Sequence, residues 1–224
     1  GGALLDYITL TQVGARPALL PPRCVSKGDQ LEIDAASRRN LELSSTLTGE
    51  RRGSLLATID RTVTAAGGRL LASRLAAPLC QAEAIIARHD SVSWALGLGS
   101  KAQVLRDYLT NCADLERALS RLAVGRGGPR DMAAIRDALQ LAERLYLQLD
   151  LSTLPAEIAA LAPKLTGQSP LYDDLATLLG AELPVLTRDG GFIARGVHAP
   201  LDELVSLRDE SRRLIAALQS RYAE

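Results

Sequence analysis

Aromatic residues are scarce in this sequence: phenylalanine, tryptophan and tyrosine make up 3% of its 224 residues, with a single Phe and a single Trp. The interiors of β-sheets are built largely from β-branched and aromatic side chains, so this scarcity argues against a β protein. The chain is instead rich in Ala, Leu, Arg and Glu, which are strong helix formers. The sequence therefore predicts an all-α protein, and its length suits one large or two small domains.

Cysteine and histidine are also few, and none of them belongs to a recognisable ligand pattern. Cys24, Cys80 and Cys112 are far apart and include no Cys-x-x-Cys pair, and His89 and His198 are isolated. This spacing argues against a zinc motif and against a disulfide framework. It favours reduced thiols in a cytoplasmic protein.

The sequence shows neither an excess of positive charge nor a long apolar run. It contains 26 Lys and Arg residues and 26 Asp and Glu residues, so its formal net charge is zero. Dedicated nucleic-acid modules usually carry a basic excess, so we expect weak or no duplex binding by these residues alone. No apolar run approaches the roughly 18 residues of a membrane span, and no signal-peptide pattern opens the chain. We expect a soluble, intracellular protein with no membrane partner.

The stretch from Leu31 to Leu79 organises the rest of the chain. Asp34 is well placed to cap a helix, because its carboxylate can accept hydrogen bonds from the free amides of the first turn. One face of that helix is predicted to hold Ala36, Asn40, Leu43 and Leu47. Arg38 and Glu42 lie four residues apart on a neighbouring face. Asn40 either ties this helix to the backbone of another segment or lies at a partly exposed edge of the stripe.

Two further helices are predicted in the same stretch. Ser54 caps a short helix that ends near Asp60. Thr62 or Thr64 caps a second helix, which runs until Pro78 stops it.

Gly67 and Gly68 lie inside that second helix, where each glycine costs on the order of 1 kcal/mol relative to alanine. Two such costs suggest that another backbone passes close by, although a flexible first turn would also explain them. Arg69 follows the glycines, and we expect its side chain to reach the turn at Asp60.

The remaining sequence alternates helical patterns with breakers. Helices are predicted over residues 81–98, from residue 100, over 111–122, from 129 to about 151, from 155 and from 170, and a final helix from Pro200. In the third of these regions, residues 111–122, Leu115, Leu119 and Leu122 are expected to share one stripe.

The final helix carries a seven-residue repeat, which is a narrow seam suited to one partner helix. The seam comprises Leu201, Leu204, Arg208, Ser211, Ile215, Leu218 and Tyr222.

The patterns that could carry chemistry have simpler structural readings. Residues 97–102 fit a Gly-x-Gly-x-x-Ala dinucleotide pattern, but the preceding residues are helical, so the glycines more simply join two helices. The acid pairs at 173–174 and 202–203 lie near helix N-termini, where carboxylates are favourable. Arg126 and Arg130 flank a glycine pair that could bind phosphate or form a helix–helix loop. We expect no catalytic, cofactor-binding or metal-binding residue in this chain, which contains no phosphate-binding loop.

Several motifs strongly resemble the central helical part of the bacterial MutS family, the DNA mismatch-recognition ATPases. The matching residues are Ile33–Leu43; Asp60, Thr62, Thr64, Gly67 and Arg69 to Leu71; Leu75, Pro78 and Leu79; Asp114–Arg117, Leu119, Arg121 and Leu122; Pro129–Asp131; and Arg188–Gly191, Ile193 and Ala194. Their order and spacing also match, over nearly the entire chain. One departure is Arg74, where the family commonly has tryptophan.

The resemblance implies an irregular multi-helix core domain with a long protruding C-terminal lever helix. It assigns residues 1–20 to the end of a connector domain and linker, 21–200 to the helical core and 201–224 to the start of the lever that leads to a clamp. It implies a non-catalytic piece of a homodimeric ATPase, in which the whole protein binds mismatched duplex DNA, a second MutS subunit, ATP and Mg.

The matched motifs name the residues expected to hold the fold together or to couple domains. They are Asp34, Arg38, Asn40, Glu42, Asp60, Thr62, Thr64, Gly67, Arg69, Pro78, Asp114, Glu116 and Arg117. The alternative hypothesis is a free-standing helical scaffold that binds a partner helix through the final seam.

Overall fold

The computed structural model describes residues 2–11, 19, 21 and 28–223, and these residues form an all-α protein, as predicted. The α-helices are α1 (Gly2–Thr11), α2 (Ala35–Asn40), α3 (Leu55–Ile59), α4 (Ala65–Ala76), α5 (Ala82–Gly97), α6 (Ser100–Thr110), α7 (Leu115–Ala123), α8 (Pro129–Gln148), α9 (Ala156–Ala159), α10 (Ser169–Leu178) and α11 (Ala199–Ala223), with 3-10 turns η1 (Ala162–Leu165) and η2 (Thr187–Asp189). None of the helices in the described ranges is long and apolar enough to cross a membrane.

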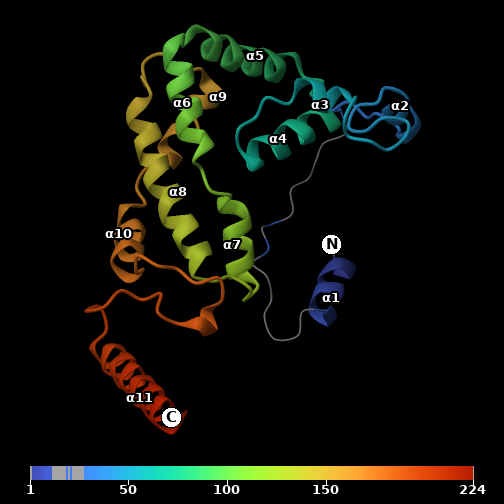
Figure 1. Cartoon of the computed structure of the whole chain (residues 1–224). Helices are drawn as coiled ribbons and strands as arrows, with labels where there is room; N and C mark the ends of the chain where they lie inside the picture. The colour runs from blue at the N-terminus through green and yellow to red at the C-terminus, as the bar shows by residue number, and fades with distance from the viewer. Residues whose placement is uncertain (1, 12–18, 20, 22–27, 224) are drawn as a thin grey trace.

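The apolar core lies where α7 and α10 pack on α8 (Figure 1). Ala118 of α7 is completely buried, and Ile135 of α8 and Leu175 of α10 are nearly so. Leu179 completes this cluster at the end of α10, where residues 178–180 pair with 192–194 through two backbone hydrogen bonds of 2.8 Å. The long helix α8 is therefore the scaffold on which the others are assembled.

The buried face of α7 differs from the predicted leucine stripe. Leu115 and Leu122 pack against the core, but Leu119 is half exposed and Ala118 takes the central position. The helix approaches α8 closely there, and a small side chain fits where a leucine would not. The prediction that Leu119 lies on the same buried stripe as Leu115 and Leu122 was therefore wrong.

Residues 28–80 form a separate small body that carries α2, α3 and α4. Its two ends are joined by a β-bridge between Gln30 and Leu79, in which the amide of Leu31 donates to the carbonyl of Pro78 at 2.7 Å. Leu43 and Leu56 are its buried apolar residues, and the amide of Leu56 donates to the carbonyl of Leu43 at 2.9 Å. Pro78 follows the end of α4, so its predicted place at the stop of that helix is confirmed.

The predicted continuation of α2 through Leu47 was wrong, because the helix ends at Asn40. Glu42 has a backbone φ of 47°, a left-handed conformation that interrupts an α-helix. Its carboxylate accepts a hydrogen bond from the amide of Leu47 at 2.7 Å, which folds the chain back as a turn. Helical periodicity continues through these residues in the sequence, but the backbone does not follow it.

The two ends of the chain carry helices with little burial. Helix α1 buries no residue. Helix α11 projects away from the α7–α8–α10 core (Figure 1). Its first turns approach residues 190–196, where the amide of Gly196 donates to Asp202 at 2.8 Å. Leu201, the first residue of the predicted seam, is partly buried there.

Candidate interhelical coupling site

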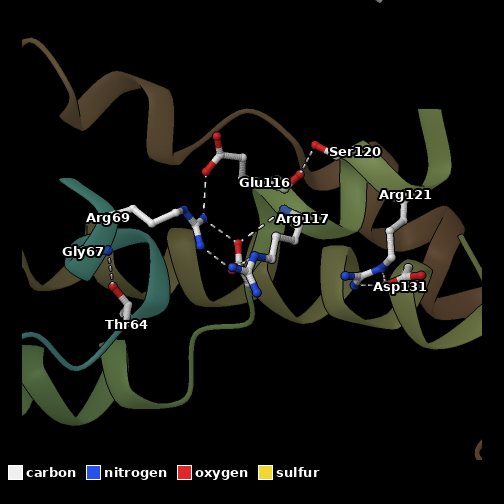
Figure 2. Close-up of polar contacts among 9 residues, drawn as sticks. Thr64, Gly67, Arg69, Glu116, Arg117, Ser120, Arg121 and Asp131 are labelled. Atoms are coloured by element: carbon white, nitrogen blue, oxygen red, sulfur yellow. Dashed lines mark hydrogen bonds and ion pairs between the residues drawn. The ribbon is translucent and has the colours of Figure 1, made fainter. Parts of the chain in front are cut away.

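Arg69 joins helix α4 to helix α7 through three hydrogen bonds. Its Nη1 and Nη2 atoms donate to Oδ2 and Oδ1 of Asp114 at 2.8 and 2.9 Å, which is the two-pronged geometry that arginine makes with carboxylates. Its Nη2 also donates to Oε2 of Glu116 at 2.8 Å. Figure 2 shows the guanidinium of Arg69 extending from α4 toward Glu116 and Arg117 on α7. We call these four residues the Arg69 cluster.

Asp114 has two functions in this cluster. It is the N-cap of α7, where its Oδ1 accepts from the amide of Arg117 at 3.3 Å, and its Oδ2 lies 3.4 Å from Nε of Arg117. The hydrogen bonds from Arg69 lower the pKa of Asp114 from its usual value to about 2, with a further contribution from the amide of Arg117. The same acids raise the pKa of Arg69. Both partners therefore carry full charge at neutral pH.

The position of Arg69 depends on the start of α4. Thr64 is the N-cap, and its Oγ1 accepts from the amide of Gly67 at 2.9 Å, so of the two predicted caps the structure selects Thr64. A Cβ atom at Gly67 would lie 2.8 Å from that same Oγ1. The glycine is needed because of the capping side chain, and not because another backbone passes nearby, as the sequence had suggested.

Asp60 is not the partner of Arg69, although the sequence had predicted this contact. Its carboxylate instead accepts from Oγ1 of Thr62 at 2.6 Å and pairs with Arg51 at 2.8 Å. The hydroxyl and amide of Thr62, followed by the charge of Arg51, lower the pKa of Asp60. Asp60 and Thr62 thus form the turn between α3 and α4, and a groove of about 450 Å³ separates this turn from Arg117.

A second polar contact joins α4 to the rest of the chain. Nη2 of Arg74 donates to Oε1 of Glu157 in α9 at 3.0 Å, and the other oxygen of Glu157 accepts from Ser91 in α5 at 3.0 Å. In addition, Arg106 of α6 donates to the backbone carbonyl of Arg61 at 3.1 Å. Arg74 is the position at which the sequence departs from the family pattern, and here it makes an ion pair.

Arg121 and Asp131 were not singled out as a pair from the sequence, although they join α7 to α8. Nε of Arg121 donates to Oδ1 of Asp131 at 2.9 Å, and Nη2 contacts the same oxygen (Figure 2). Oδ2 of Asp131 accepts from the amide of Gly128 at 3.0 Å, which closes the first turn of α8. The acid three residues after Gly128 was the available signal, since an acid at this position commonly closes a helix start.

The predicted residues of α2 lie outside the Arg69 cluster. Asp34 caps α2 as predicted, accepting from the amides of Ala36 and Ser37 at 2.9 Å, and the bonds from Ser37 lower its pKa. Arg38 donates to the carbonyl of Ile33 at 3.3 Å. Asn40 is exposed, so of its two interpretations the structure selects the exposed edge. No hydrogen bond or ion pair among the described residues joins this group to Arg69.

The remaining chemical patterns are structural elements of the helices and their junctions. Residues 97–102 form the junction between α5 and α6, where Gly99 has a φ of 55°, and not a strand–helix crossing. Arg130 donates to the carbonyl of Leu183 at 3.1 Å. Within residues 2–11 and 28–223, no cluster of three His, Cys, Asp or Glu side chains could hold a metal ion.

The sequence is similar to known proteins along nearly its whole length. The family model described as MutS domain III matches residues 36–224. The DNA mismatch repair protein MutS of Roseobacter denitrificans is 49% identical over 222 residues, which is 99% of this chain and 25% of that protein. The proteins of the same name from Nitrobacter winogradskyi and a Caulobacter species are 49% and 46% identical, over 99% and 100% of this chain. The chain spans about a quarter of the length of these relatives.

Proposed function

Because this chain belongs to the MutS family and corresponds to its domain III, we propose that it is a non-catalytic helical domain that couples a DNA clamp to an ATPase domain. The whole protein would bind mismatched duplex DNA, ATP and Mg, and a second MutS subunit, and would act in mismatch repair in the cytoplasm. Residues 1–20 would end a connector domain, 21–200 would be the core and 201–224 would begin the lever. The chain alone would bind duplex weakly or not at all.

The observation that carries this proposal is the polar joint at Arg69. A coupling domain needs packed bodies that keep their shape while their relative arrangement changes. The α7–α8–α10 core is packed through buried apolar side chains, whereas residues 28–80 make polar contacts with the rest of the chain: Arg69 to α7, Arg74 to α9, and Arg61 to Arg106 of α6. Ion pairs near the surface exchange readily for water, so this joint can open without exposing an apolar core.

The prediction that Asp34, Arg38, Asn40 and Glu42 contribute to coupling between domains remains a proposal. These residues lie in or next to α2, within the small body of residues 28–80 (Figure 1). In this proposal they present a contact surface to a neighbouring domain. When that domain moves the small body, the Arg69 cluster transmits the movement to α7.

A chimera tests the proposal in a whole protein. This chain replaces the matching quarter of the MutS protein of Roseobacter denitrificans, and three quantities are measured: mismatched-duplex affinity, basal ATP hydrolysis, and stimulation of hydrolysis by mismatched duplex. We expect Arg69→Ala to lower the stimulation by about fivefold or more, the usual range of coupling between sites, while the first two quantities change little. Arg69→Lys should give a stimulation between those of the parent and Arg69→Ala, because lysine keeps the charge but cannot donate two parallel hydrogen bonds.

Arg136→Ala is the matched control, because Arg136 pairs with its neighbour Asp137 on the same helix and joins no two bodies. Circular dichroism and thermal unfolding establish that each variant is folded. A chimera with Arg69→Ala whose hydrolysis is stimulated as strongly as that of its parent would refute the coupling role of the joint.

A further inference from the structure

A groove of about 470 Å³ lies beside helix α2, between that helix and the turn that follows it. Its lining comes from residues 33–39 and 44–49, and the charged side chains in it are Arg38 and Arg39. Among the described residues that line the groove, none carries a carboxylate. The groove therefore has a net positive charge and suits an anionic group.

The acidic residues on either side of α2 do not neutralise these two arginines. The carboxylate of Asp34 caps the helix and accepts from two backbone amides of its first turn. The carboxylate of Glu42 accepts from the amide of Leu47 at 2.7 Å. Arg38 donates to a backbone carbonyl at 3.3 Å, and the exposed guanidinium of Arg39 makes no hydrogen bond or ion pair within residues 2–11 and 28–223.

The rest of the lining is uncharged and partly apolar. Ser44 and Ser45 contribute hydroxyl groups, which can donate to an anion. Ile33 and Leu47 contribute apolar side chains, and Leu47 is 65% exposed. A large apolar side chain in contact with water beside two arginines fits a ligand that carries both an anionic group and an apolar group.

A protein segment fits this lining better than a nucleic acid. Single strands are usually bound by aromatic side chains that stack on the bases, and no described residue in the lining is aromatic. Duplex DNA is bound through contacts from Lys and Arg to many phosphates, whereas this groove offers two arginines in a chain of zero net charge. A single carboxylate needs no more than one or two guanidinium groups.

Resting on the proposed function, in which the region around α2 faces a neighbouring domain, we propose that the groove receives an acidic segment of that domain. The segment presents the carboxylate of an Asp or Glu to Arg38 and Arg39, and a large apolar side chain to Leu47. This chain spans about a quarter of the length of its relatives, and the segment belongs to the remainder of the whole protein.

Site-specific photocrosslinking in the chimera tests this proposal. Leu47 is replaced by p-benzoylphenylalanine, the chimera is irradiated without nucleotide, with ADP and with ATP, and the crosslinked peptides are identified by mass spectrometry. In at least one state we expect capture of a segment of another domain that has an Asp or Glu within about three residues of the crosslink, a span of roughly 10 Å. Leu70 is the matched control position, because it is 52% exposed on the same small body but does not line the groove.

Charge reversal tests the pairing with a carboxylate. In the chimera that carries the probe at Leu47, Arg39→Glu should lower the crosslink yield by about fivefold, because an attractive contact becomes repulsive. Arg52→Glu is the matched control and should leave the yield unchanged, since Arg52 is also exposed on the small body but lies outside the groove lining. Replacing the captured acid by arginine should restore the yield in the Arg39→Glu chimera. Thermal unfolding establishes that each variant is folded.

Three results would overturn the proposal. The first is no crosslink from Leu47 in any nucleotide state, or a yield at Leu70 equal to that at Leu47. The second is capture of duplex DNA, or of a protein segment without an acid. The third is a yield that Arg39→Glu leaves unchanged. The crosslink reports contact and not stimulation of hydrolysis, so a chimera that forms it while Arg69→Ala keeps full stimulation would refute the coupling joint alone.

Discussion

Helices α8 and α4 show two different ways of attaching a helix to the same protein. Helix α8 buries five of its residues and contacts α6, α7 and α10. Helix α4 buries none and reaches α7 and α9 through the charged ends of Arg69 and Arg74. Apolar packing falls off steeply when surfaces separate, whereas ion pairs can be replaced by water at small cost. The comparison shows a chain that is held by apolar packing around α8 and by charged side chains at α4.

The largest expected effect comes from a substitution in the apolar core around α8. Leu175 lies in the core between α10 and α8 and is 6% exposed. We expect Leu175→Ala to lower the free energy of unfolding by about 2–4 kcal/mol, because it removes buried methyl groups and leaves a cavity. Urea denaturation followed by circular dichroism measures this change.

Leu171→Ala on the same helix is the control, since Leu171 is 46% exposed, and its cost should stay below about 1 kcal/mol. Equal costs at the two positions would contradict the assignment of the core to this side of α10.

A smaller and pH-dependent effect is expected at the polar joint. The pKa of Asp114 is lowered to about 2 in the folded chain, below its usual value of 3.8. A lowered carboxyl pKa stabilises the folded state at pH values above the unfolded pKa, and this stabilisation is lost as the pH falls through the folded pKa. The difference in unfolding free energy between the original chain and Asp114→Asn should therefore be constant above about pH 4 and shrink between pH 4 and 2.

Urea denaturation of the two proteins at pH 6, 4, 3 and 2 measures this difference, and the titration of other carboxyl groups cancels between them. A difference that persists unchanged at pH 2 would show that Asp114 stabilises the fold mainly as something other than a charged partner of Arg69.

The smallest expected effect is a difference in stability between two Gly→Ala substitutions, one of them at the start of α4. At Gly97, the last residue of α5, a Cβ atom would meet nothing within 4 Å, so Gly97→Ala should stabilise the fold by about 0.5–1 kcal/mol. At Gly67 the same change would displace Oγ1 of the capping Thr64, and losing such a cap costs about 1 kcal/mol.

We therefore expect Gly67→Ala to be less stable than Gly97→Ala by about 1 kcal/mol in thermal unfolding. Hydrogen exchange should place the loss in residues 65–76. If the two variants were equally stable, the cap at Thr64 would contribute nothing to the stability of α4.

The parts of the fold that were predictable from the sequence depend on short-range chemistry. Asp34, Ser54 and Thr64 cap helices within three residues of themselves, so their side chains and the following pattern sufficed to find them. The end of α2 was missed because the left-handed backbone of Glu42 leaves the hydrophobic spacing unbroken. Ala118 was missed because a small residue on a leucine-rich helix gives no sign that it is the most buried.

The candidate site was predictable as a set of residues but not as an arrangement. Arg69, Asp114, Glu116 and Arg117 were all named from the family motifs, yet Arg69 was assigned to Asp60, which is nine residues away in the chain. Its true partner is 45 residues away, and charge alone cannot choose among the chain's 26 acids. The partnership of Arg74 with Glu157, 83 residues apart, was hidden for the same reason.

The contact between Arg69 and Asp114 also closes a ring. Helices α5 and α6 lie between these two residues in the sequence, and the two hydrogen bonds from the Arg69 guanidinium to the Asp114 carboxylate close this segment into a loop. The entropy lost on closing such a ring grows only with the logarithm of its length. The segment that carries α5 and α6 could therefore lengthen or shorten with little change in the entropy cost of closing the ring.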